Sequence, residues 1–223
     1  MRNDMDQAPE IVVEQLGAVR RTLRIAVVTE TYPPEVNGVA LSAARFVEGL
    51  RRRGHEIQLI RPRQDRSERA SGRLEVLTGG LLIPRYPDLR MGLPATRILV
   101  RLWRQSRPDV VHVVTEGPLG WSAVNAARKL KLPVVSDFRT NFHSYSEHYG
   151  LGWLSRPILA YLRKFHNRTL CTLVPTDALR EDLAAVGFRR LKVIGRGVDT
   201  RRFDPALRDE ALRASWEIGR AHV

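Results

Sequence analysis

Residues 23–40, "LRIAVVTETYPPEVNGVA", join a short β-branched run to the start of a helical pattern. The run 23–29 has the apolar character of a strand that is buried on both faces of a parallel sheet. Between strand and helix, Pro33 and Pro34 stiffen the chain, and the pair Asn37-Gly38 readily adopts positive φ. We therefore predict a rigid strand-to-helix turn at which the backbone comes close to a ligand.

Strand and helix patterns alternate through the rest of the chain. Helical patterns are predicted at 38–55, 94–108, 116–133, 157–169 and 177–188. Strand patterns are predicted at 56–62, 109–115, 134–138, 171–176 and 191–195, with further strand pieces at 73–79 and 81–87. This alternation predicts an α/β fold, a Rossmann-like parallel sheet with helices on both faces.

Ligands of such sheets bind beyond the carboxyl ends of the strands. Those ends carry the segments "TETYPPEVNG" at 29–38, "TEGPLG" at 115–120 and "SDFRTNFH" at 136–143. The amide groups at the start of the helix after the first turn form a ready site for an anion such as a sugar phosphate or a nucleotide diphosphate. The turn has neither the Gly-Lys-Ser/Thr of a Walker loop nor the spacing of a dinucleotide fingerprint.

The composition is that of a soluble globular protein, with 43% hydrophobic and 27% charged residues. The net charge of +13 comes almost entirely from arginines that are scattered along the chain, and no nucleic-acid motif accompanies them. We therefore expect no nucleic-acid partner, whereas phosphorylated substrates and anionic lipid headgroups fit this charge. No apolar run is long enough to span a membrane and the N-terminus has no apolar signal region. We expect a cytoplasmic protein that can contact the inner membrane face peripherally.

Isolated cysteine and histidine residues offer little chemistry. Cys171 is the only cysteine, which excludes an internal disulfide, and its apolar surroundings predict a buried structural thiol. His112 lies inside an apolar strand and is predicted to be a core residue with its hydrogen bonds satisfied. His143 and His148 lack a suitably spaced third ligand, so no metal site is expected.

Four separated stretches together resemble one family. They are "RIAVVTETYPPEVNGVALSAARFVEGLRRRGHEIQLIRP" at 24–62, "RPDVVHVVTEGPLGWSAVNAARKLKLPVVSDF" at 107–138, "LVPTDALREDLAAVGF" at 173–188 and "VIGRGVDTRRFDP" at 193–205. They resemble, in the same order, the retaining glycosyltransferases of the GT-B fold in family 4 (glycosyl transferase group 1), which include bacterial mannosyltransferases. The resemblance covers residues 23–216.

The resemblance implies the N-terminal half of a GT-B fold. Residues 1–22 would be a tail, 23–195 the Rossmann-like acceptor-side domain, and 196–216 the interdomain junction that begins a C-terminal domain. Residues 217–223 are expected to be non-native, because "EIGRAHV" is what a common sequencing-library adapter encodes past its first bases.

The resemblance also assigns site residues. Asn37, Gly38 and Arg196 would contact the diphosphate of the donor, and the acceptor cleft would be lined by Glu116, Gly117, Arg139, Asn141 and His143. Arg139 stands where many relatives have a histidine. No catalytic residue is assigned, and neither a metal nor a cofactor is expected, because the nucleotide diphosphate sugar is itself the donor substrate.

The implied function is transfer of a hexose, mannose by first choice, from a nucleotide diphosphate sugar to a lipid, glycan or small-molecule acceptor. The isolated chain is expected to be inactive. Two alternatives stay open: a non-catalytic binding module or split-enzyme subunit, and a nucleotide-sugar epimerase of the same architecture.

Overall fold

The computed structural model describes residues 21–65, 67–83, 86–139, 152–195, 197–201 and 203–216. Within them, seven parallel strands form one sheet in the order β3-β2-β1-β6-β7-β8-β9. Their bounds are β1 Arg24–Val28, β2 Glu56–Pro62, β3 Glu75–Thr78, β6 Val110–Val113, β7 Val134–Asp137, β8 Cys171–Val174 and β9 Leu191–Val193. The predicted Rossmann-like α/β fold is therefore confirmed.

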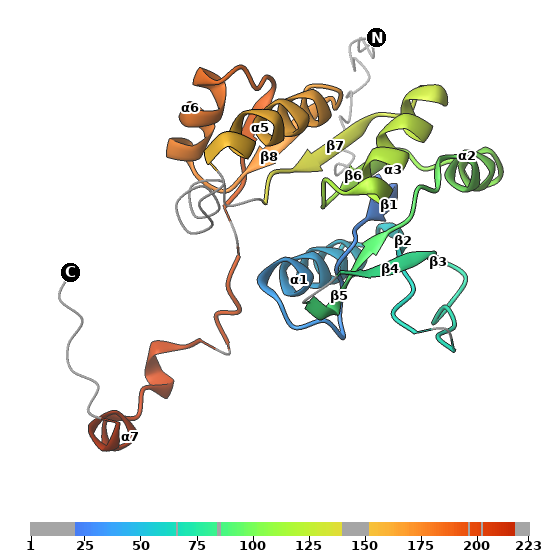
Figure 1. The fold of residues 1–223 in the computed structure, drawn as a ribbon. Helices are drawn as coiled ribbons and strands as arrows, with labels where there is room; N and C mark the ends of the chain where they lie inside the picture. Colours follow the sequence, from blue (N-terminus) through green and yellow to red (C-terminus); the bar gives the residue numbers. More distant parts are fainter. Residues whose placement is uncertain are drawn as a thin grey trace, which may run out of the picture.

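The central strand β1 separates two apolar clusters. Ile25 and Val27 pack with α1 (Gly38–Arg52), whereas Ala26 and Val28 belong to the cluster that contains α2 (Thr96–Gln105) and α3 (Pro118–Lys129). Successive side chains of a strand point to opposite faces, so an uninterrupted apolar run places helices on both sides of the sheet. Figure 1 shows α1 on one side of the sheet and α3 on the other.

Two further helices cover the strands at the β9 end of the sheet. The helices α5 (Gly152–His166) and α6 (Asp177–Ala185) contribute Leu162 and Leu183 to a third apolar cluster, which includes Phe138 and Val174 at the ends of β7 and β8. Phe165 of α5 belongs to the α2–α3 cluster. The helix α5 thus joins the two clusters on this side of the sheet.

Two elements differ from the sequence prediction. The strand pieces predicted at 73–79 and 81–87 become β3 at the edge of the main sheet and β4 (Gly80–Ile83), which pairs antiparallel with β5 (Tyr86–Gly92) in a separate two-stranded sheet. The helix predicted at 157–169 runs instead from Gly152 to His166, with Pro157 in its interior. Proline is favoured in the first turn of a helix and disfavoured in its interior, so the position of Pro157 inside α5 is not one that sequence rules indicate.

The segment after β9 carries little regular structure in the described residues. It contains the short helix η1 (Pro205–Leu207) and α7 (Glu210–Ser215), and in Figure 1 it runs away from the sheet. Phe203, Leu207 and Trp216 are 60%, 69% and 64% exposed. Among the described residues, no helix is long and apolar enough to cross a membrane.

Candidate functional site at the carboxyl edge of the sheet

The strand order places a switch point between β1 and β6. From β1 the chain proceeds to β2 and β3 on one side, and from β6 it proceeds to β7, β8 and β9 on the other. The loops that follow β1 and β6 consequently diverge at the carboxyl edge, which is where open α/β sheets bind ligands. Their first residues are held together, because the Glu30 amide donates to Oγ1 of Thr115 at 2.9 Å.

Asn37 caps the helix that follows β1. Its Oδ1 accepts a hydrogen bond from the Ala40 amide at 2.8 Å, and its Nδ2 donates to Oγ1 of Thr31 at 2.6 Å. Its backbone is extended, with φ −147° and ψ 162°, as is usual for an N-cap. The predicted positive φ at Asn37-Gly38 is therefore wrong, because the N-cap geometry turns the chain into the helix without a left-handed residue. The Asn37 side chain is committed to the loop itself.

Gly38 is the first residue of α1 and is exposed. A Cβ built on it meets no other atom within 4 Å. The start of α1 thus opens to free space next to the strand ends.

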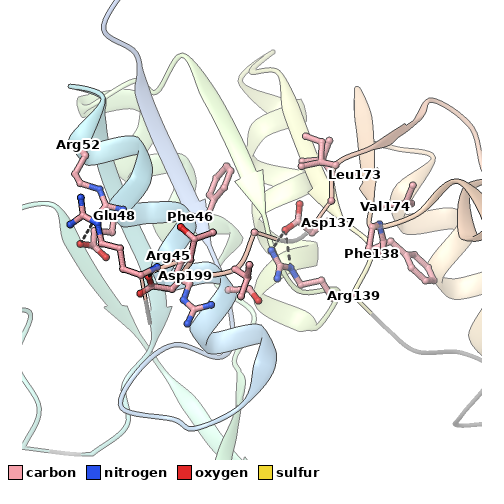
Figure 2. A pocket seen from close by; sticks show the side chains of 18 residues that line it. Arg45, Phe46, Glu48, Arg52, Asp137, Phe138, Arg139, Leu173, Val174 and Asp199 are labelled. Carbon is pink, nitrogen blue, oxygen red and sulfur yellow. Dashed lines mark hydrogen bonds and ion pairs between the residues drawn. The ribbon is translucent and has the colours of Figure 1, made fainter. Parts of the chain in front are cut away.

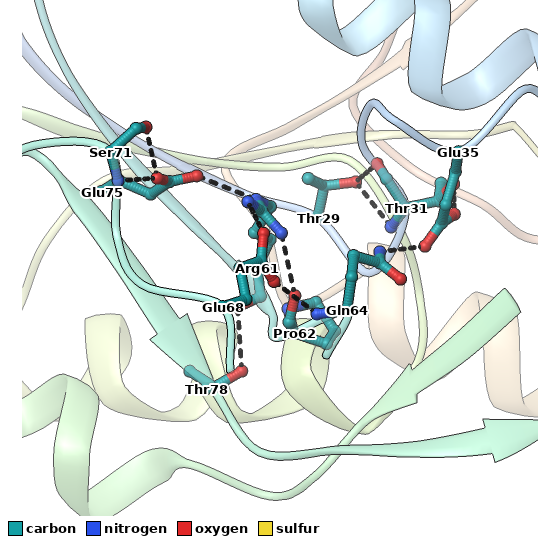
Figure 3. Close-up of polar contacts among 10 residues, drawn as sticks. All are labelled: Thr29, Thr31, Glu35, Arg61, Pro62, Gln64, Glu68, Ser71, Glu75 and Thr78. Atoms are coloured by element: carbon teal, nitrogen blue, oxygen red, sulfur yellow. Dashed lines mark hydrogen bonds and ion pairs between the residues drawn. The ribbon is translucent and has the colours of Figure 1, made fainter. Parts of the chain in front are cut away.

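A chain of polar contacts supports this loop from the side of β2 (Figure 3). Glu35 is buried and accepts hydrogen bonds from the hydroxyl of Thr31 and from the side-chain amide of Gln64, which follows β2. The backbone N–H of Gln64 in turn donates to Oε2 of Glu68 at 2.6 Å. Arg61, buried in β2, pairs with Glu68 at 2.6 Å and with Glu75 at 2.9 Å. The loop after β1 is thereby anchored to the neighbouring strands.

Glu30 connects the loop to the start of α3. Its Oε1 accepts a hydrogen bond from the Leu119 amide at 2.8 Å. Gly117, the N-cap of α3, provides no capping side chain, and a Cβ there would lie 2.1–2.3 Å from the Glu30 carboxyl group. Burial raises the pKa of Glu30 to about 7, although the hydrogen bonds from backbone amides act in the opposite direction. Glycine at 117 therefore leaves the space in which a carboxyl group from another loop caps α3.

Glu116 faces α5. Its backbone oxygen accepts a hydrogen bond from the Tyr161 hydroxyl at 2.5 Å, and its Oε1 lies 3.4 Å from Nε2 of the buried His166. At this distance Oε1 of Glu116 and Nε2 of His166 are close enough for an ion pair, but their geometry is not that of a hydrogen bond. Nδ1 of His166 lies 2.9 Å from the hydroxyl of Ser136.

Asp137, at the end of β7, is held by two side chains, those of His112 and Arg139. Its Oδ1 lies 2.8 Å from Nε2 of His112, and its Oδ2 accepts hydrogen bonds from Nε and Nη2 of Arg139 at 2.8 and 2.5 Å. Burial alone would raise the pKa of Asp137, but the hydrogen bond from His112 and the charge of Arg139 outweigh it and lower the pKa below its ordinary value. Asp137 is thus a buried carboxylate whose charge is balanced within the protein.

His112 fits the prediction of a core residue only in part. It is 4% exposed and its ring packs edge-on against Phe46 of α1 with centroids 4.7 Å apart. Nδ1 is buried without a hydrogen-bond partner among the described residues. One ring nitrogen of His112 thus contacts Asp137, and the other is not satisfied by any described residue.

A cavity of about 840 Å³ lies between α1, the ends of β7 and β8, and the segment 194–201 (Figure 2). Its charged lining residues in the described part of the chain are Arg45, Glu48, Arg52, Asp137, Arg139, Asp199 and Arg201. Figure 2 shows Arg139 joined to Asp137 on one side of the cavity and Arg45 on the other. The cavity is large enough for a sugar-sized ligand.

The predicted site residues do not all meet in this cavity. Arg139 lines it, but Asn37, Gly38, Glu116 and Gly117 are not among its described lining residues. Instead, Glu116 and Gly117 lie where α3 starts, and Asn37 and Gly38 where α1 starts. The predicted residues Arg196, Asn141 and His143, and also His148, lie outside the described residues.

Several site residues escaped the sequence analysis. Glu30 and Asp137 stand at strand ends in segments that the prediction quoted, yet their role depends on Leu119, Gly117 and His112 far along the chain. Arg45 gave no signal, because an exposed arginine on a helix is ordinary. Position at a strand end was the one available clue.

The structure adds two facts on metal and thiol chemistry. Among the described residues, no group of three or more His, Cys, Asp or Glu side chains is arranged to hold a metal ion. Cys171 is free and only partly buried, so the prediction of a buried structural thiol is wrong about its burial. It begins β8, whose alternating pattern buries Thr172 and Val174 instead.

Comparison with known proteins links this fold to sugar transfer. A GDP-mannose-dependent alpha-mannosyltransferase of Mycolicibacterium smegmatis is 37% identical over 199 residues, which are 87% of this chain and 53% of that protein. The enzyme of the same name from Mycobacterium tuberculosis is also 37% identical, over 87% of this chain and 52% of its own. The alpha-monoglucosyldiacylglycerol synthase of Streptococcus pneumoniae is 26% identical over 86% of this chain and 44% of its own. The chain thus spans about half the length of the curated relatives it matches.

Solved structures share the fold at low sequence identity. A glycosyltransferase from Rickettsia africae has a TM-score of 0.55 at 14% identity, covering 89% of this chain and 50% of its own. Anabaena HepE in complex with UDP-glucose has a TM-score of 0.56 at 15% identity, over 87% of this chain and 50% of its own. A UDP-N-acetylglucosamine 2-epimerase has a TM-score of 0.50 at 15% identity, over 79% of this chain and 49% of its own. These likenesses concern the fold alone.

A family model covers most of the described sheet. The model for Glycosyltransferase Family 4 matches residues 36–202, from the loop that precedes α1 to the segment that follows β9. The resemblance deduced from the four sequence stretches is thereby confirmed. This chain belongs to Glycosyltransferase Family 4.

Proposed function

We propose that this chain forms the acceptor-side half of a retaining glycosyltransferase that moves mannose from GDP-mannose to an acceptor hydroxyl. The observation that carries the proposal is the uncovered start of α1 at Gly38, placed at the strand-end edge beside the switch point. The free amides of a helix start, with the positive end of the helix dipole, stabilise a departing diphosphate. The donor is named by the relatives at 37% identity, both GDP-mannose-dependent.

In this proposal the β1 loop is the rigid wall of the donor site. Asn37 and Glu35 hold its backbone through side-chain hydrogen bonds, so the amides at Gly38 are oriented before the donor binds. Arg196, in the segment after β9, would contact the same diphosphate. Electrostatic stabilisation of this kind works best when the donors need not reorganise during the reaction.

The domain limits belong to the same proposal. Residues 23–195 would form the acceptor-side domain and 196–216 the start of the junction, while the nucleotide would be held mainly by a second half supplied from outside this chain. Residues 1–223 alone are accordingly expected to transfer no sugar.

The proposal is tested with the full-length gene product and a panel of nucleotide sugars. We expect GDP-mannose to be consumed and mannose to be transferred. Gly38→Asp should raise the KM for GDP-mannose at least tenfold, because a carboxylate at the helix start repels the diphosphate while it favours the helix dipole. Gly38→Ala is the matched control, since its Cβ enters open space. Equal KM values for the two variants would contradict the proposed phosphate contact.

The same assay separates transfer from epimerisation. The 2-epimerase among the structural neighbours shares only the fold, whereas the relatives at 37% identity are named as transferases. Release of an epimerised nucleotide sugar without transfer to any acceptor would favour the epimerase alternative.

A peripheral membrane contact is a second part of the proposal. Arg97, Arg101 and Arg104 are exposed along α2, beside Ile98, which is 56% exposed. A basic helix face with an apolar side chain suits an anionic membrane surface, and the pneumococcal relative is named for a glycolipid product. We therefore place the enzyme in the cytoplasm, at the inner membrane face, with a lipid or glycan acceptor.

Vesicle sedimentation checks this contact. The chain should co-sediment with vesicles containing phosphatidylglycerol and not with neutral phosphatidylcholine vesicles. The double variant Arg97→Gln/Arg101→Gln should lose most of the binding, whereas the charge-matched Arg51→Gln/Arg53→Gln variant at the exposed end of α1 should retain it. An equal loss of vesicle binding in both double variants would show that binding depends on the net charge of the chain and not on the face of α2.

A further inference from the structure

We propose that the 840 Å³ cavity recognises an acceptor bearing an anionic group, a carboxylate or phosphate on a sugar-like body, through Arg45, Arg139 and Arg201. This inference rests on the proposed function, since it names the class of acceptor that the enzyme takes. The three arginines come from α1, the end of β7 and the segment after β9, and they converge on one cavity although they are far apart in the sequence.

Arg139 is held in a fixed orientation. Its Nε and Nη2 both donate to Oδ2 of Asp137, and its side chain is 14% exposed. In the described part of the chain, no hydrogen bond of Nη1 is seen. A guanidinium that is locked by one carboxylate can present its remaining N–H groups to a second anion without further loss of side-chain freedom.

Asp137 balances the charge of Arg139, so Arg139 would offer an external anion its remaining N–H donors. Arg45 and Arg201 would supply the attraction by charge. Both oxygens of Asp137 are already engaged, Oδ1 by His112 and Oδ2 by Arg139. Phe46 of α1 packs edge-on against the His112 ring and so helps to hold it in place. The carboxylate therefore acts as an internal support for Arg139.

The other charges of the cavity leave two arginines uncompensated. Arg52 is paired with Glu48 at 2.9 Å, and Asp199 has a partner of its own. The guanidinium groups of Arg45 and Arg201 have no hydrogen bond or ion pair within the described residues. Planar guanidinium groups bind carboxylates and phosphates in bidentate fashion, which gives selectivity for an anion of that shape.

The cavity also offers surface for a sugar body. Phe46, Phe138, Leu173, Val174 and Pro175 line it beside the arginines. Apolar and aromatic walls with a few oriented polar groups are typical of small-molecule sites. An anion alone would not need these walls.

Equilibrium binding to residues 1–223 tests the inference. Isotope-labelled chain is titrated with glucose 6-phosphate, glucuronate, glucose and inorganic phosphate, and chemical shifts are followed. We expect both anionic sugars to bind at least tenfold more tightly than glucose and than inorganic phosphate. Arg45→Gln should weaken their binding at least fivefold without loss of folding, because Arg45 contacts no charged partner in the described residues.

Two further variants complete the design. Arg139→Lys keeps a cation beside Asp137 but removes the planar guanidinium group with its several N–H donors. It should also weaken binding at least fivefold, while thermal unfolding shows that the fold is intact. Arg128→Gln, at an exposed position in the last turn of α3, removes the same charge at a distance and should change binding less than twofold.

Four outcomes would overturn the inference. They are equal affinity for glucose and glucose 6-phosphate, equal affinity for inorganic phosphate, an equal loss in Arg128→Gln, or unchanged binding in Arg45→Gln. Competition by GDP-mannose that depends on Arg45 would instead assign the cavity to the donor, and would overturn the acceptor assignment while leaving the proposed function intact. Failure of mannose transfer by the full-length enzyme would appear only in the transfer assay, so the two failures are distinguishable.

Discussion

The loop after β1 and the end of β7 leave the same edge of one sheet but satisfy their polar groups differently. In the β1 loop, the side chains of Glu30, Glu35 and Asn37 accept hydrogen bonds from neighbouring protein groups. The donors lie in α3, in the segment after β2 and in α1, respectively. At the end of β7, Asp137 and Arg139 pair with each other, and the cavity beside them contains Arg45 and Arg201, whose guanidinium groups have no partner among the residues that the structure describes. A closed network fixes the position of a backbone, whereas uncompensated charge is available for a ligand.

This contrast suggests that the two regions would contact ligands through different groups. The β1 loop would present backbone amides, which need accurate placement and no side-chain charge. The β7 side would present guanidinium groups, which select a ligand by charge and shape. Substitutions on the closed side should therefore change folding stability, and those on the open side should change binding.

The largest effect is expected from Gly117→Ala. Its Cβ would lie 2.1–2.3 Å from the Glu30 carboxyl group, so this buried side chain must leave its place and the Leu119 amide loses its acceptor. We expect a loss of about 3 kcal/mol or more in the free energy of unfolding, measured by urea denaturation. Gly38→Ala, with no atom within 4 Å of its Cβ, should change stability by less than about 1 kcal/mol. Similar losses of stability in both variants would contradict the claim that the start of α3 is tightly packed whereas the start of α1 is open.

A smaller, pH-dependent effect is expected from Glu30→Gln. The pKa of Glu30 is raised by burial from 4.5 to about 7, so the folded protein binds more protons than the unfolded chain between these values. Wild-type stability should therefore fall as the pH rises through this window, by about 3 kcal/mol in total, and stay level above it. Glutamine retains an acceptor for the Leu119 amide but does not titrate. Urea denaturation from pH 4.5 to pH 8 should show that the free energy of unfolding of the variant rises relative to that of the wild type. If both free energies changed with pH in the same way, a raised pKa of Glu30 would be contradicted.

The smallest effect is expected from a comparison of two helix caps. Asn37 caps α1 and also bonds to Thr31 and Glu35, whereas Thr176 caps α6 through a single hydrogen bond to the Leu179 amide at 3.2 Å. Thr176→Ala should cost about 1 kcal/mol and Asn37→Ala about 2 kcal/mol. Equal losses by thermal or urea unfolding would show that the extra contacts of Asn37 do not stabilise the loop.

The sequence alone predicted the architecture through hydrophobic patterning. The run at 25–28 is apolar at successive positions, as expected for a strand that is covered on both faces, and the alternation with helical patterns predicts parallel strands. It also located the strand ends that carry Glu116, Gly117 and Arg139. Helix limits were less certain where a local rule was ambiguous, as at Pro157 inside α5.

The tertiary structure alone decided which of these residues meet. Residues at least 25 positions apart meet in three places: Glu30 caps α3, His112 contacts Asp137, and Arg45, Arg139 and Arg201 converge on one cavity. Periodicity reports which side of an element is buried, because burial follows local geometry. It does not report which strand lies beside which, and that order, set by packing of the whole chain, determines the site.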